Sequence, residues 1–77
     1  MNDSINLENF LFKNVIMTDI NGNIHKGYVG LYETPYENES NEDSIGILIN
    51  PQAEIGIEFY QSEIKSIVID EEREKNR

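Results

Sequence analysis

The sequence predicts a mostly β domain, in which a short N-terminal helix precedes a five-stranded, strongly bent antiparallel sheet. Five short segments rich in Val, Ile, Phe and Tyr alternate with turn signals. Gly27 and Gly30 interrupt the longest of these segments, and glycine inside a strand marks a bulge, a bend or a close backbone approach. A chain of 77 residues has room for one domain, which we place at residues 1–69, followed by a charged tail at 70–77.

The first segment, about residues 4–12, is expected to be a short helix. Asp3 or Ser4 can cap it, and Leu7, Phe10 and Leu11 recur at helical spacing and would form one apolar stripe. A helix of this length is unstable alone, so its stripe is expected to pack on the sheet.

The first two strands, at residues 15–20 and about Ile24–Glu33, are expected to form a hairpin around Asn21–Gly22. This dipeptide favours a type I′ turn, in which both central residues have positive φ. The glycines of the second strand favour a sheet that curls into a small barrel. A local twist without closure is the alternative.

The remaining three strands are expected at about residues 44–49, 54–60 and 64–69. Asn50–Pro51 is a turn signal that ends the third strand. In the fourth strand Ile55, Ile57 and Phe59 alternate with other positions, which is typical of a strand with one buried face. Only three residues, 61–63, separate the last two strands, enough for a tight turn or a single 3₁₀ turn.

The tail at 70–77 alternates in charge and holds no apolar residue. This composition is typical of a frayed helical end or a disordered tail, and a partner-binding role is the alternative.

The charge of the chain limits its partners. Six Lys and Arg against fifteen Asp and Glu give a net charge of −9. Such a chain lacks the basic surface of a general nucleic-acid binder and is repelled by anionic membranes. The apolar runs are too short to span a bilayer, and the N-terminus carries an acid without a basic cluster. We therefore expect a cytoplasmic protein that does not bind membranes.

The residue types also argue against catalysis. The chain has no cysteine, so it has neither a disulfide framework nor a thiolate metal site. His25 is the one histidine, and its place near a hairpin turn favours a surface role. No spacing brings a nucleophile, a base and an orienting group together. We expect no enzymatic activity, no metal and no cofactor.

Three stretches carry a resemblance to a known family: residues 21–27, Asn38–Glu39 with 43–45, and residues 58–67. Together with the order of the elements over residues 14–69, they resemble the Sm-like (Lsm) proteins, in particular small uncharacterised members from Gram-positive bacteria and their mobile elements. The resemblance implies a small barrel of the Sm-like and SH3-like kind. It also implies a homo-oligomer, in which the fourth strand of one subunit pairs with the fifth of the next. The residues then at or near the seam are Ile57, Phe59 and Ile67.

The RNA-reading part of the family pattern is altered in this chain. An Asp and an Asn after the second strand help form a base pocket in the family, and Glu33 and Asn38 are the nearest matches, with extra residues between them. Gln61–Ser62 stands where the family carries an Arg-Gly pair. The resemblance therefore implies the fold more strongly than RNA binding.

Two functions follow as hypotheses. The first is a non-catalytic Sm-like module for assembly or protein interaction, and the alternative is a weak RNA-binding Sm-like protein. A local RNA site would use Tyr36, Asn38 and Lys65. An acidic loop, which would either contact a basic protein or serve only as a solvated surface, comprises Glu33, Glu37, Glu39, Glu42 and Asp43.

Overall fold

The computed structural model describes residues 5–37 and 41–75. One antiparallel sheet forms the body of this described chain, in the strand order β4-β3-β2-β1-β5. Its strands are β1 (Asn14–Asp19), β2 (Ile24–Glu33), β3 (Ser44–Leu48), β4 (Gly56–Tyr60) and β5 (Ile64–Ile69). A 3₁₀ turn, η3 (Gln61–Glu63), connects β4 to β5. The mostly β, five-stranded antiparallel prediction is confirmed.

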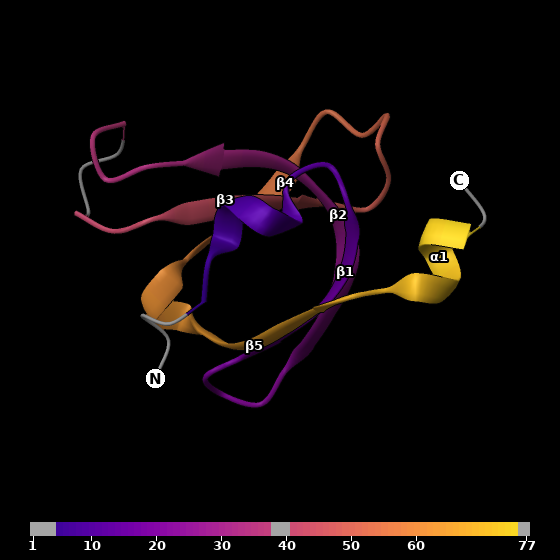
Figure 1. Ribbon diagram of the computed structural model, residues 1–77, viewed down its shortest axis with the longest axis horizontal. Coiled ribbons are helices and arrows are strands. Elements are labelled where there is room, and N and C mark those ends of the chain that lie inside the picture. Colours follow the sequence, from indigo (N-terminus) through magenta and orange to yellow (C-terminus); the bar gives the residue numbers. More distant parts are fainter. Residues whose placement is uncertain (1–4, 38–40, 76–77) are drawn as a thin grey trace.

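The sheet bends strongly around a central core, as Figure 1 shows. At Gly27, a Cβ atom would collide with the Leu48 carbonyl oxygen and lie 2.6 Å from Ile47 Cγ2, so only glycine permits this close approach. At Gly30 the pairing of β2 with β3 shifts register, which is a bulge that turns the strand. Both glycines therefore have the bending roles that the sequence predicts.

The bent sheet stops short of a barrel. β4 pairs only with β3, and β5 pairs only with β1, among the pairings of the described strands. The two edge strands are joined through η3 but form no ladder with each other. The closed barrel is therefore wrong, and the sheet remains open between β4 and β5.

The hydrophobic core lies on the concave side of the sheet. Its buried side chains come from all five strands and from the N-terminal segment, and they are Leu7, Val15, Met17, Val29, Ile45, Ile47, Phe59, Ile64 and Ile67. In β1 and β3 the core residues alternate along the strand, as in a sheet with one buried face. Among residues 5–37 and 41–75, no helix has the length and apolar character needed to cross a membrane.

The N-terminal segment differs from the expected helix. It forms a single 3₁₀ turn, η2 (Leu7–Phe10), that begins after Asn6, whose side chain accepts a hydrogen bond from the Glu8 N–H. Phe12 has a φ of 65° and donates its N–H to the Val29 carbonyl, so the chain turns into the sheet before a longer helix can form. Asp3 and Ser4, the predicted caps, lie outside the described residues. The apolar stripe packs on the core as predicted.

The β1–β2 hairpin also uses a different turn. Gly22 has a φ of 89°, whereas Asn21 is not among the described residues with positive φ, so the type I′ prediction is wrong. The Gly22 N–H donates to the Asp19 carbonyl oxygen at 2.9 Å. The Asp19 carboxylate accepts from the N–H groups of Asn21 and Asn23. These bonds to one aspartate stabilise a longer turn, in which only the glycine needs positive φ.

The described part of the tail folds back on the sheet. α1 (Glu71–Lys75) is a single helical turn, and Asp70, which is buried, precedes it. The Asp70 N–H donates to the Asn14 carbonyl at 2.9 Å, and the Glu74 carboxylate accepts from the backbone and side-chain N–H groups of Asn14. Residues 71–75 are therefore helical, as one of the two sequence-based alternatives predicts, but they are attached to β1, so neither a frayed end nor a disordered tail describes them.

Candidate interaction site

Two edge strands with exposed apolar side chains are the first candidate surface. Ile57 on β4 is 61% exposed and Val68 on β5 is 55% exposed. Apolar side chains on an unpaired strand edge favour pairing with another chain, because the backbone N–H and C=O groups there lack a ladder partner. Ile55, which precedes β4, is also apolar and is more exposed than either of these two residues.

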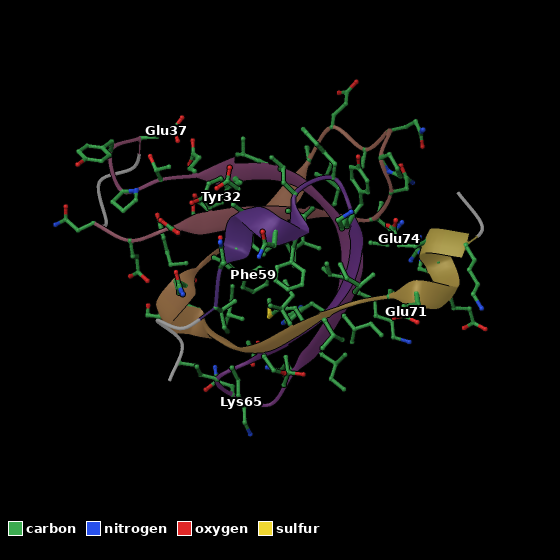
Figure 2. All side chains as sticks on the ribbon, viewed as in Figure 1. Tyr32, Glu37, Phe59, Lys65, Glu71 and Glu74 are labelled. Atoms are coloured by element: carbon green, nitrogen blue, oxygen red, sulfur yellow. The ribbon has the colours of Figure 1, made fainter. Side chains whose placement is uncertain are left out.

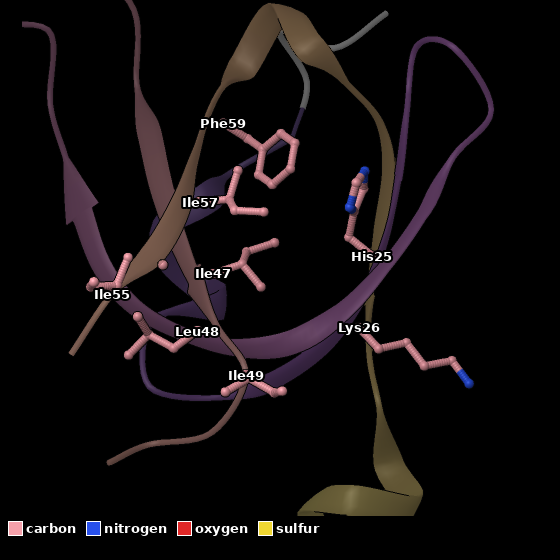
Figure 3. Close-up of a pocket in the computed structure, with 9 residues that line it drawn as sticks. His25, Lys26, Ile47, Leu48, Ile49, Ile55, Ile57 and Phe59 are labelled. Carbon is pink, nitrogen blue, oxygen red and sulfur yellow. The ribbon is translucent and has the colours of Figure 1, made fainter. Parts of the chain in front are cut away.

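An apolar groove adjoins the β4 edge. We call it the isoleucine groove, and it has a volume of about 430 Å³. It is lined by His25, Lys26, Ile47, Leu48, Ile49, Ile55, Gly56, Ile57 and Phe59. Figure 3 shows Ile57 and Phe59 on one side of this space and His25 on the other. The groove thus opens the concave side of the sheet to solvent next to an edge strand.

The His25 side chain in this groove contacts the carboxylate of Asp19 and the ring of Phe59. Its Nε2 lies 2.9 Å from Asp19 Oδ2, and its ring packs against the Phe59 ring with centroids 4.7 Å apart. The hydrogen bond from His25, together with the Asn23 N–H, lowers the pKa of Asp19 from 3.8 to about 2. The arrangement links the β1–β2 hairpin to β4.

The predicted seam residues divide between surface and core. Ile57 is exposed beside the open edge, whereas Phe59 and Ile67 are buried in the core. Phe59 nevertheless lines the isoleucine groove, so it lies near the predicted seam without being exposed on it. Val68, the exposed neighbour of Ile67, was missed because the sequence offers no signal for which face of β5 is covered.

The acidic loop uses its described carboxylates locally. Glu37 accepts from the N–H and hydroxyl of Thr34, and Glu42 accepts from the N–H and hydroxyl of Ser62. Asp43 accepts from the Tyr32 hydroxyl at 3.1 Å. These three carboxylates thereby stabilise the loop and η3, which favours a structural role for them. Glu39 lies outside the described residues.

The candidate RNA-binding residues are not brought together. Tyr36 is fully exposed in the loop after β2, next to Glu37, and Lys65 is exposed on β5. Figure 2 shows Glu37 and Lys65 at different sides of the molecule. Asn38 lies outside the described residues. Lys65 therefore lies away from Glu37 in the loop that carries Tyr36.

A second groove, absent from the sequence-based hypotheses, lies over β2, β3 and β4. We call it the glycine groove, and its volume is about 400 Å³. It is lined by Gly30, Leu31, Glu33, Gly46, Leu48, Ala53, Glu54, Gly56 and Glu58. The three glycines are visible in the sequence, but their lateral alignment depends on strand register.

No group of three or more His, Cys, Asp or Glu within residues 5–37 and 41–75 is arranged to hold a metal ion. No family model, no curated protein and no solved structure matches this chain.

Proposed function

We propose that this chain is a non-catalytic, cytoplasmic Sm-like module that assembles with copies of itself. In this proposal β4 of one copy pairs with β5 of the next. The observation that carries it is the presence of two unpaired strand edges on one molecule, each with an exposed apolar side chain, Ile57 on β4 and Val68 on β5. A contact between two different edges is heterologous, and repetition of it produces a ring or a filament.

The isoleucine groove supports the same contact. It adjoins the β4 edge, and its apolar lining is open to solvent in the single chain. A strand added along β4 would bring apolar side chains over this lining and remove it from water, which stabilises association in proportion to the apolar area buried. Backbone hydrogen bonds to the free β4 edge would add to this gain.

Weak RNA binding is a less supported alternative. The body, residues 1–69, has only Lys13, Lys26 and Lys65 as basic residues. Lys65 lies on a different side of the molecule from Glu37, the sequence neighbour of Tyr36. Phosphate binding depends on clustered positive charge, so this arrangement favours assembly over RNA recognition.

The oligomeric state tests the proposal. Sedimentation velocity and multi-angle light scattering, from low to high micromolar concentration, are expected to show a species larger than one chain. Ile57→Lys or Val68→Lys places a charge on one edge and is expected to yield monomers. Ile24→Lys is the matched control, because Ile24 is also an exposed strand residue but lies on an interior strand of the sheet.

A mixture of the two edge variants sharpens this test. Each retains one intact edge, so the mixture is expected to form a dimer through the two unmodified edges and nothing larger. A wild-type chain that remains monomeric throughout the concentration range would contradict the proposal. An Ile24→Lys variant that dissociates as completely as the edge variants would also contradict it.

A further inference from the structure

The glycine groove is formed on the convex face of the sheet by the alternation of β3 and β4. Ile45, Ile47 and Phe59 point into the core, so Gly46, Leu48 and the other alternate positions face outward. The register of the strands then places these outward residues in rows. One row contains Leu31, Gly46 and Glu58, and the next contains Tyr28, Leu48 and Gly56.

Glycine makes the floor of this groove. A Cβ at Gly30 would lie 2.6 Å from Leu48 Cδ1, and a Cβ at Gly56 would lie 2.5 Å from Leu48 Cδ2. The Leu48 side chain therefore lies between the two glycines. Leu31 lies over Gly46, where a Cβ would be 3.4 Å from Leu31 Cβ, and about half of the Leu31 side chain is exposed. The three glycines thus leave room for two leucines, which form the apolar surface of the groove.

The rim of the groove is acidic. Glu33, Glu54 and Glu58 line it, and none of its nine lining residues is Lys or Arg. The Glu58 carboxylate accepts a hydrogen bond from the Ser44 hydroxyl at 2.9 Å, which holds it in its row. Glu58 chiefly, with burial and Glu63, Glu33 and Glu42, raises the pKa of the neighbouring Tyr60 hydroxyl. Negative charge is therefore concentrated beside the two leucines.

We infer that the glycine groove binds a positively charged, amphipathic segment of a partner protein. An apolar side chain of that segment would pack on Leu31 and Leu48, and its Lys or Arg side chains would pair with the rim carboxylates. Charge complementarity selects this occupant, since an acidic or nucleic-acid ligand would face three carboxylates without a basic residue in the lining. Gly56 and Glu58 of the edge strand β4 line part of this groove, but its two leucines lie on the interior strands β2 and β3, so the inference does not rest on self-assembly.

A peptide of defined design tests the inference. The probe is a fluorescein-labelled, end-capped helical peptide with leucines at i and i+4 flanked by arginines, and its partner probe has serine at both leucine positions. Binding is measured by fluorescence anisotropy, and its location by amide chemical shifts of the ¹⁵N-labelled protein. We expect the leucine peptide to bind at least about tenfold more tightly, because the serine peptide buries no apolar surface. The largest shifts are expected at Gly30, Gly46 and Gly56.

Two variants locate the site. Glu54→Lys is expected to weaken binding about five- to tenfold, because it reverses one of the three rim charges, and Leu31→Ser by about tenfold, because it removes one of the two leucine side chains. Both residues are exposed, so neither substitution disturbs the core. Glu72→Lys on α1 makes the same change in net charge at an exposed site outside the groove and is the matched control. Its effect is expected to stay below about twofold, because exposed charges act weakly over such separations.

Three results would overturn the inference. Equal binding of the leucine and serine peptides would show that charge alone attracts the probe. Equal weakening by Glu54→Lys and Glu72→Lys would show that net charge, not the groove, is responsible. Chemical shifts confined to β5 or α1 would place the peptide elsewhere. The oligomeric state of the same samples is measured separately, so failure of self-assembly and failure of peptide binding are distinguishable.

Discussion

The substitution Gly27→Ala provides a sharp test of how the sheet bends. An added Cβ would collide with the Leu48 carbonyl oxygen, which is backbone, and approach Ile47 Cγ2 to 2.6 Å in the core. Neither neighbour moves without shifting β3, and overpacking of this kind costs about 1–3 kcal/mol. Gly27 has no positive φ, so the expected loss is steric and not a backbone preference.

Gly46→Ala is the matched control. It also adds one methyl group to a strand glycine without positive φ, but its Cβ would meet Leu31 Cβ at 3.4 Å, an ordinary contact. Alanine reduces the conformational freedom of the unfolded chain, which favours folding by about 0.4–1 kcal/mol. We therefore expect Gly46→Ala to leave stability unchanged or slightly increased, and Gly27→Ala to lower it by about 2 kcal/mol.

Urea unfolding followed by circular dichroism measures this difference. With a urea slope of about 1–2 kcal/mol per molar, the Gly27→Ala midpoint is expected to fall by about 1–2 M. The measurements are made at one protein concentration in a Val68→Lys background, because self-association would otherwise add to the apparent stability. Equal midpoints for Gly27→Ala and Gly46→Ala would refute the close approach of β2 to β3 as the cause of the bend.

Two further substitutions test the turn and the C-terminal segment. The pKa of Asp19 falls from 3.8 to about 2 in the folded chain, so its contribution to stability is present above about pH 4 and is lost as the pH falls toward 2. When urea unfolding is measured from pH 7 to pH 2, the free energy of unfolding is expected to fall less with decreasing pH for Asp19→Asn than for wild type. The same fall for both proteins would contradict this. Glu74→Ala is expected to cost about 1–2 kcal/mol in thermal or urea unfolding, because the Asn14 N–H groups lose a charged acceptor. Glu72→Ala, at an exposed position of the same helix, is expected to stay within about 0.5 kcal/mol, and equal losses for the two would show that α1 is not held through Glu74.

The local patterns predict all five strands, although β4 begins at Gly56 and not at residue 54, and of the alternating Ile55, Ile57 and Phe59 only Phe59 is buried. Alternating apolar residues and the spacing of turn signals place β2 and β5 at the observed bounds, Ile24–Glu33 and Ile64–Ile69. Gly27 and Gly30 indicate the bend, because a glycine inside a strand usually marks a bulge, a bend or a close backbone approach. Both features depend on neighbouring residues in the chain, so a single sequence reveals them.

Specific hydrogen bonds, one set within the turn and one between distant residues, explain two of the errors. The predicted type I′ turn at Asn21–Gly22 was replaced by a longer turn because the Asp19 carboxylate accepts the N–H groups of the loop. The expected helix at residues 4–12 shortened because Phe12 bonds to Val29 of β2. The free energy that such a hydrogen bond contributes is comparable to the free energy of the local conformational preference that it overrides.

The candidate surfaces also differ in how far the sequence alone predicts them. Through a family resemblance, the sequence predicts contact between β4 and β5 with Ile57, Phe59 and Ile67 at or near the seam, and the structure shows that of these three only Ile57 is exposed. The acidic loop was visible as a run of carboxylates, but their use by Thr34, Ser62 and Tyr32 became visible only in three dimensions. No sequence pattern predicts the glycine groove, because its leucines and carboxylates come from β2, β3, β4 and the segment before β4.

By itself the sequence determined a small, acidic, mostly β domain with a sheet curved at two glycines, because composition and strand periodicity are local properties of the chain. Only the tertiary structure decided that the sheet stays open between β4 and β5, that residues 70–75 attach to Asn14, and that an acidic rim surrounds Leu31 and Leu48. The physical reason is register: which residues become lateral neighbours depends on hydrogen bonds between strands, and side-chain period alone leaves that alignment open.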